Sequence, residues 1–134
     1  AVAVAAPSGL ITPIVRHADR KSIGRISDEM RELAGRAKAG RLRPEEFQGG
    51  GFTISNLGMH GIRQFSAIVN PPQACILAVG AAEQRPVVRN GAIAIATLMT
   101  CTLSIDHRSV DGVLGAEFLG AFKSLIEAPV ALVM

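Results

Sequence analysis

Residues 92–127 read AIAIATLMTCTLSIDHRSVDGVLGAEFLGAFKSLIE, and this stretch does most to define the fold. Its first part, residues 92–105, is a run of apolar and small residues that predicts β-structure. Its last part predicts a helix over residues 113–127, with an apolar stripe at helical spacing formed by Leu114, Phe118, Phe122, Leu125 and Ile126. Pro129 ends this helix, and Asp111 is suited to cap its start. The polar heptapeptide between the two elements therefore lies at a strand end, where side chains are held yet exposed.

The chain before this stretch contains short predicted strands and one more helix. Residues 1–6 and 10–15 predict two strands of a hairpin, because proline, serine and glycine at residues 7–9 make a turn. A second amphipathic helix with one buried stripe is predicted from residues at steps of three and four: Ile23, Ile26, Met30, Leu33, Ala34 and Ala37. Gly40 and Pro44 end this helix, and Pro44 also starts a short helical turn.

The remaining elements are strands. Three runs predict them, at residues 52–55, 65–69 and 75–79, and the last two are apolar enough to be buried. Asn90-Gly91 predicts a tight hairpin turn because this pair accepts positive φ angles, and the strand after it is expected to continue to Ile105. Several strands with two long helices predict an α/β fold, a two-layer sandwich with a mixed sheet.

Composition excludes several classes of protein. The 134 residues are one domain or part of one, and 49% of them are hydrophobic. No run reaches the ~18 apolar residues of a membrane span, and the apolar start lacks the charged leader of a signal peptide. Cys75 and Cys101 lie in apolar runs, and we expect two buried packing thiols in a reducing compartment rather than a disulfide.

The net charge of +3 is unevenly distributed. Residues 16–43 carry nine basic and four acidic side chains, and the basic ones alternate with apolar residues at helical spacing. We interpret this segment as a solvated helix face rather than a nucleic-acid surface, and a phosphate-bearing cofactor is compatible with it. The glycines at residues 49–51 lack the lysine and serine of a phosphate loop, and no histidine–cysteine cluster has metal-ligand spacing.

His107 is the strongest candidate for chemistry, since imidazole exchanges protons near neutral pH. The plain alternative is a surface histidine beside a helix cap, and capping alone could explain Asp111. Ser55 ends a predicted strand after a glycine-rich approach, where a hydroxyl is often only structural. A hydrolase triad is disfavoured because no G-x-S-x-G motif surrounds Ser55.

Four blocks of sequence resemble the dihydrolipoamide acyltransferases, the core components of 2-oxo acid dehydrogenase complexes. The heptapeptide DHRSVDG at residues 106–112 is similar to their D-H-R-x-x-D-G signature, whose shorter form H-x-x-x-D-G occurs in chloramphenicol acetyltransferases. The other blocks are GLITPIV at residues 9–15, FTISNLGM at 52–59 and IVNPPQACILAVG at 68–80. The last two blocks are most similar to the acetyl-transferring members, which belong to pyruvate dehydrogenase complexes.

The resemblance implies a chloramphenicol acetyltransferase-like fold and a role for each matching residue. His107 would be the general base that removes the thiol proton of coenzyme A or dihydrolipoamide, and Ser55 would stabilise the tetrahedral oxyanion. Asp111 would hold the local backbone, and Leu77 would lie near the pantetheine arm. Coenzyme A is then a substrate, lipoamide is carried on a separate domain, and no metal takes part. Residues 1–134 would be the C-terminal portion of one catalytic domain, without a lipoyl or peripheral-subunit-binding domain.

The resemblance also implies a large assembly. Homotrimers, in which the histidine of one subunit faces the serine of the next, would build a larger cage through the apolar tail at residues 130–134. The implied partners are lipoyl domains and the decarboxylase and dihydrolipoamide dehydrogenase components, with no nucleic acid and no membrane. The implied location is the bacterial cytoplasm or the mitochondrial matrix. Two alternatives stay open, a catalytically inactive structural core subunit and another coenzyme A-dependent acetyltransferase of the same fold.

Overall fold

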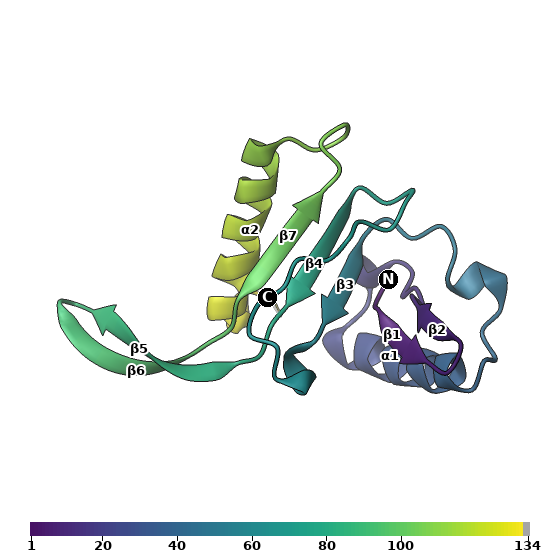
Figure 1. Ribbon diagram of the computed structural model, residues 1–134, viewed down its shortest axis with the longest axis horizontal. Helices are drawn as coiled ribbons and strands as arrows, with labels where there is room; N and C mark the ends of the chain where they lie inside the picture. Colours follow the sequence, from purple (N-terminus) through teal and green to yellow (C-terminus); the bar gives the residue numbers. More distant parts are fainter. Residues whose placement is uncertain (133–134) are drawn as a thin grey trace.

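A three-stranded mixed sheet lies at the centre of the computed structural model, which describes residues 1–132 (Figure 1). Its strands are β3 (Thr53–Asn56), β4 (Cys75–Val79) and β7 (Cys101–Ile105), in the spatial order β3-β4-β7. β3 runs parallel to β4, and β7 runs antiparallel to it. Residues 76–78 of β4 are all buried, as expected for a central strand whose two faces are covered.

Helical units lie at the two ends of the strand order. Beside β3, the antiparallel hairpin of β1 (Val4–Ala6) and β2 (Gly9–Ile11) lies against α1 (Ile23–Lys38) (Figure 1). Beside β7, α2 (Gly112–Glu127) runs along the strand (Figure 1). Residues 1–132 also contain four short 3-10 helices: η1 (Ala18–Arg20), η2 (Pro44–Glu46), η3 (Gly58–His60) and η4 (Pro129–Leu132).

The core lies between α1, the N-terminal segment and β4. Its buried apolar residues are Val4, Ile14, Leu33, Ala37, Ile76, Leu77, Ala78 and Ala81. Two buried polar residues, Thr53 and Gln73, adjoin this core, and the Thr53 hydroxyl donates a hydrogen bond to Gln73 Oε1. The pairing satisfies both groups, which would otherwise be costly to bury.

A long hairpin projects from the body of the molecule (Figure 1). It consists of β5 (Glu83–Arg89) and β6 (Ala92–Leu98), and its turn has φ angles of 51° at Asn90 and 78° at Gly91. The predicted hairpin and its turn are therefore confirmed. The expected single strand to Ile105 is not continuous, because residues 99–100 separate β6 from β7. At the base of the hairpin, Gly80 passes so close to Arg63 that an added Cβ would lie 2.0 Å from the Arg63 carbonyl oxygen.

Most predicted elements are confirmed, including the α/β class, the mixed sheet, both long helices and the N-terminal hairpin. The prediction of a buried strand at residues 65–69 is wrong. This segment belongs to no strand of the described chain, and Ile68 is 92% exposed. An apolar run becomes a strand only when another strand offers its N–H and C=O groups, and residues 1–132 provide no such neighbour here.

Burial also differs from expectation in detail. On α1, Leu33 and Ala37 are buried as predicted, but Ile23 at the start of the stripe is 59% exposed. Cys75 and Cys101 are free thiols, as predicted, although both are half-buried rather than fully buried. Within residues 1–132, the helices are too short or too polar to span a lipid bilayer.

Candidate active site

The turn that carries His107 follows β7 directly and is held at several points by its backbone. The N–H of Asp106 donates to the carbonyl oxygen of Ala74 at 2.7 Å, which ties the turn to the start of β4. The carbonyl oxygen of Asp106 accepts from the N–H groups of Ser109 and Val110, at 2.9 and 3.0 Å. His107 itself is exposed. The predicted location of His107, at the rim of the sheet where a strand ends, is confirmed.

Asp106 and Arg108 form an ion pair across His107. Asp106 Oδ1 accepts from the Arg108 N–H and from Nε, both at 3.0 Å, and Oδ2 accepts from Nη2 at 2.7 Å. The hydrogen bonds from the Arg108 side chain hold the pKa of Asp106 down, at about 2. Arg108 is therefore paired with a carboxylate, although its side chain is largely exposed.

Asp111 caps α2. Its carboxylate Oδ1 accepts from the N–H of Leu114 at 2.9 Å, and its own backbone is extended, as is typical of an N-cap residue. The predicted capping role is therefore confirmed. Asp111 lies four positions after His107, so the helix begins directly after the histidine turn.

Ser55 lies on β3 beside a cavity. The residue is half-buried, pairs with Ala78 on β4, and lines a cavity of about 790 Å³ together with Thr53, Asn70 and Gln73. Thr53 and Ser55 are two residues apart on one strand and therefore share a face. The cavity gives the Ser55 hydroxyl an open space in which a bound group could accept its hydrogen bond.

Leu77 lies at the middle of β4, between Ile54 on β3 and Leu103 on β7. Its side chain is 2% exposed, so in this chain it belongs to the core. A role near a pantetheine arm stays a prediction.

Ser55 and His107 do not come together within one chain. Ser55 pairs with Ala78, and Ala78 pairs with Thr102, so these three residues form one row across the sheet. His107 lies five residues beyond Thr102, past the opposite end of β7, with β4 between it and β3. At about 3.3 Å per residue and about 4.8 Å per strand, the two side chains are separated by on the order of 20 Å.

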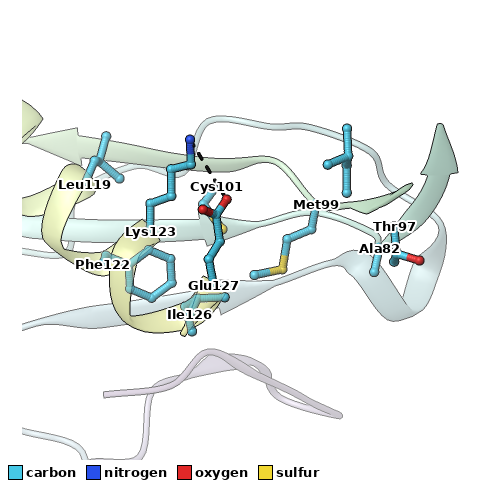
Figure 2. A pocket seen from close by; sticks show the side chains of 10 residues that line it. Ala82, Thr97, Met99, Cys101, Leu119, Phe122, Lys123, Ile126 and Glu127 are labelled. Carbon is cyan, nitrogen blue, oxygen red and sulfur yellow. Dashed lines mark ion pairs between the residues drawn. The ribbon is translucent and has the colours of Figure 1, made fainter. Parts of the chain in front are cut away.

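A second cavity, of about 550 Å³, lies between α2 and the junction of β6 with β7 (Figure 2). Its lining is mainly apolar and includes Met99, Phe122 and Ile126, with the Lys123–Glu127 ion pair at 3.9 Å beside them. Cys101 also lines it, and burial raises the pKa of this thiol. None of the predicted site residues lines this cavity. Its lining comes from α2 and from strand ends far apart in sequence, so no local pattern predicted it.

Within residues 1–132, no group of three or more histidine, cysteine, aspartate or glutamate side chains is placed to hold a metal ion.

Two residues near the site were not singled out from sequence. Asp106 was noted only as part of a motif, although the spacing of an acidic and a basic residue around His107 is a signal for a local ion pair. Gln73 follows two prolines and precedes an apolar run, and its polar side chain is the only feature that distinguishes it in the sequence. Only the fold shows that Gln73 is buried next to Thr53 and lines the cavity beside Ser55.

Known proteins with a similar sequence cover nearly the whole chain. The chain is 61% identical over 128 residues to the dihydrolipoyllysine-residue acetyltransferase component of the pyruvate dehydrogenase complex from Rickettsia felis, which covers 96% of this chain and 31% of that protein. The mitochondrial component of the same name from Dictyostelium discoideum is 52% identical over 136 residues, which covers 99% of this chain and 21% of that protein. The chain thus spans a third or less of these relatives.

Solved structures agree in fold. The dihydrolipoamide acetyltransferase of Azotobacter vinelandii, described in a study of one serine, one histidine and one asparagine in its catalytic mechanism, matches with a TM-score of 0.95 at 36% identity. The match covers 99% of this chain and 55% of that one. The cubic core of a pyruvate dehydrogenase multienzyme complex matches with a TM-score of 0.95 at 35% identity, over 99% and 55% of the two chains.

The family assignment follows from a family model together with these matches. The model of the 2-oxoacid dehydrogenases acyltransferase family (catalytic domain) matches residues 1–134, which is the entire chain. The resemblance seen in the sequence is therefore confirmed, and this chain belongs to the 2-oxoacid dehydrogenase acyltransferase family.

Proposed function

We propose that this chain carries acetyl transfer between the thiols of dihydrolipoamide and coenzyme A, as part of the core of a pyruvate dehydrogenase complex. One observation carries the proposal. The serine, histidine and asparagine named for the Azotobacter enzyme are separated by 52 and then 4 positions. Ser55, His107 and Asp111 have the same two spacings in this chain.

His107 is the general base of the proposed reaction. Its imidazole takes the proton from the coenzyme A thiol, because only the thiolate attacks well and a free thiol is mostly protonated at neutral pH. The thiolate sulfur then bonds to the carbonyl carbon of acetyl-dihydrolipoamide, and the carbonyl electrons move onto oxygen. When this tetrahedral intermediate collapses, the bond to the lipoyl sulfur breaks, and the leaving thiolate takes the proton back from His107.

Ser55 is the proposed oxyanion donor. Its hydroxyl, beside a cavity and on a rigid strand, donates a hydrogen bond to the oxygen that becomes negative in the tetrahedral intermediate. One such donor contributes about 3 kcal/mol to the transition state. Asp111 holds the turn by capping α2, and Leu77, buried on the central strand, lies beneath the path of the pantetheine arm in this proposal.

We place this active site between two chains of a homotrimer. A serine and a histidine on the order of 20 Å apart in one chain cannot act on the same carbonyl group, whereas two chains side by side can present one residue each. The unpaired segment at residues 65–69 supports contact between chains, because an extended apolar segment without a strand neighbour offers its backbone to another edge.

The wider proposal follows the family. Residues 1–134 form the C-terminal portion of a catalytic domain, homotrimers build a larger cage, and coenzyme A and lipoamide, the latter on a separate lipoyl domain, are the substrates. The decarboxylase and dihydrolipoamide dehydrogenase components are the partners. Relatives from bacteria and from a mitochondrion support a location in the bacterial cytoplasm or the mitochondrial matrix.

The direct test replaces His107 by alanine in the full-length protein. Acetyl transfer from acetyl-coenzyme A to free dihydrolipoamide should fall at least ~100-fold, because the general base is gone, while assembly stays normal. Near-normal turnover would refute the catalytic role of His107. If the unaltered protein assembles but shows no transfer at all, it is an inactive structural subunit.

The shared site has its own test. Trimers of His107→Ala alone should be nearly inactive, and trimers of Ser55→Ala alone should retain ~1% activity. When the two variants are co-assembled from the unfolded state, some interfaces regain both groups, and activity should rise well above the sum of the separate preparations. Simple additivity in verified mixed trimers would exclude a site between chains and leave the acetyl transfer itself unaffected.

A further inference from the structure

Asp106 uses all of its polar groups to hold the turn around His107. Its N–H donates to Ala74 on one side, and its carbonyl oxygen accepts from Ser109 and Val110 on the other. Its two carboxylate oxygens bind the backbone N–H and the guanidinium of Arg108. His107 therefore lies between two residues that are bonded to each other by backbone and side chain at once.

General stability does not account for this arrangement. The Arg108 side chain is 88% exposed, and exposed ion pairs contribute only about 0–1 kcal/mol to folding. The helix that follows has its own cap in Asp111. The Asp106–Arg108 pair instead links the two residues on either side of His107. This link restricts the direction in which the imidazole points away from the turn.

We propose that Asp106 is a positioning residue for His107, and that it acts through its ion pair with Arg108. This inference rests on the proposed function, because it concerns the same histidine. Its consequence for catalysis is steep, since a displacement of about 1 Å in a catalytic group can cost on the order of 100-fold in rate. Asp106 is not itself a catalytic residue, because its carboxylate is occupied by Arg108.

The first readout separates turnover from binding, measured with the full-length assembled protein. In Asp106→Ala, kcat should fall ~10-fold or more while the KM for coenzyme A stays within ~2-fold. Asp106→Asn keeps an oxygen that can accept from the Arg108 N–H, so its loss of kcat should be smaller. Asp28→Asn removes another aspartate–arginine pair, with Arg31 on α1 at 3.2 Å, and serves as the control with unchanged kcat.

The second readout is the pH dependence of His107. The ionisable groups around the turn are Asp106, Arg108, the capping Asp111 and the Cys75 thiol, whose strand position pairs with Ile105. Arg108→Ala leaves an uncompensated negative charge beside His107, which favours the protonated imidazole and moves the acidic limb of the activity profile to higher pH. Asp106→Asn leaves an uncompensated positive charge and moves it to lower pH. The double variant should return the limb toward its original position.

Shifts of opposite sign would not arise from a general loss of folding, because that would affect both variants alike. Unchanged kcat and unchanged pH profiles in all variants would overturn the proposal. Equal losses of kcat in Asp106→Asn and Asp106→Ala, with pH profiles that do not shift, would also overturn it. The His107→Ala variant keeps the two hypotheses apart. If His107→Ala is inactive and the Asp106 and Arg108 variants behave normally, only the positioning role fails. If the protein shows no transfer, the NMR titration of the His107 ring in the same variants still decides whether the pair controls it.

Discussion

The two long helices have the same length but differ in how much of their apolar surface the chain buries. α1 and α2 both contain 16 residues, but α1 is polar on average and buries Leu33 and Ala37, whereas α2 is apolar on average and buries only Gly115. Much of the apolar surface of α2 is open to solvent, with Val113 70%, Leu114 52% and Phe118 41% exposed. An apolar pattern therefore indicates a helix face that is suited to be covered. It does not indicate whether the covering surface belongs to the same chain.

Ion pairs show the same contrast. On the α1 side, Lys21 and Glu29 pair at 2.5 Å, and Arg36 binds both oxygens of Glu46 at 2.7 Å. On α2, the Lys123–Glu127 pair is looser, at 3.9 Å, and both side chains are largely exposed. The α1 side therefore has tighter ion pairs within the chain than α2, whose apolar face is left largely exposed.

The largest expected effect concerns the end of α2. Deleting residues 130–134 should leave trimers intact and abolish larger assemblies, because Val130 and Leu132 in η4 are 66% and 45% exposed and offer apolar surface for docking. Residues 133 and 134 lie outside the described part of the chain. Light scattering after size exclusion measures the outcome, with Arg31→Ala on α1 as a control that should assemble fully. Full-size cages from the truncated protein would show that the tail is dispensable.

The next effect compares one leucine on each helix. Leu33→Ala should lower the free energy of unfolding by about 3 kcal/mol, because the side chain is 5% exposed and its removal leaves a cavity. Leu114→Ala should cost less than about 1 kcal/mol in the single chain, where that side chain is half exposed. Both changes introduce the same helix-forming residue. Urea unfolding of both variants measures the two losses of unfolding free energy. Equal losses would mean that the outer face of α2 is covered in solution.

Local signals explain what the sequence could predict. Asn90-Gly91 defined a hairpin because its two φ angles are properties of the residues themselves, and Asp111 defined a helix start because its acceptor lies within three residues. The DHRSVDG motif placed His107 correctly at a strand end for the same reason. Each of these predictions needed only neighbours in sequence.

Distant partners explain what could not be predicted. Residues 65–69 have the composition of a strand, but a strand also requires a neighbouring edge, which residues 1–132 do not supply. The burial of Gln73 against Thr53 depends on how β3 and β4 are aligned, and no local pattern reports that register. The separation of Ser55 from His107 likewise follows from the strand order β3-β4-β7 and not from their spacing.

A smaller effect is the acid sensitivity of the α1 side. The Arg36 guanidinium lowers the pKa of Glu46 from its ordinary value of 4.5 to about 2. A lowered carboxyl pKa contributes stability that is present above pH 4.5 and is lost as the pH falls toward 2. Glu46→Gln should therefore unfold at lower urea at pH 7, and its urea midpoint should change less than that of the original protein between pH 5 and 2 (a window of about three units). Glu127→Gln on α2 is the matched control, and an equal response there would remove the distinction between the two sides.

The smallest effect concerns the two helix caps. Ser22 Oγ accepts from the Arg25 N–H at 3.3 Å, whereas Asp111 Oδ1 accepts from the Leu114 N–H at 2.9 Å with a charged oxygen. We expect Asp111→Ala to cost about 1 kcal/mol in unfolding free energy and Ser22→Ala about 0.5 kcal/mol. Asp111→Asn should restore the stability, since asparagine caps helices about as well as aspartate.

The same Asp111 variants separate capping from catalysis. If Asp111 acts only by holding the end of the histidine turn, acetyl transfer in Asp111→Asn should stay within ~3-fold of the original rate, because the cap is kept while the charge is lost. Asp111→Ala should lose more, because the turn is freed together with the helix start. A large loss of kcat in a fully stable Asp111→Asn protein would contradict this expectation and assign the carboxylate charge itself a part in the reaction.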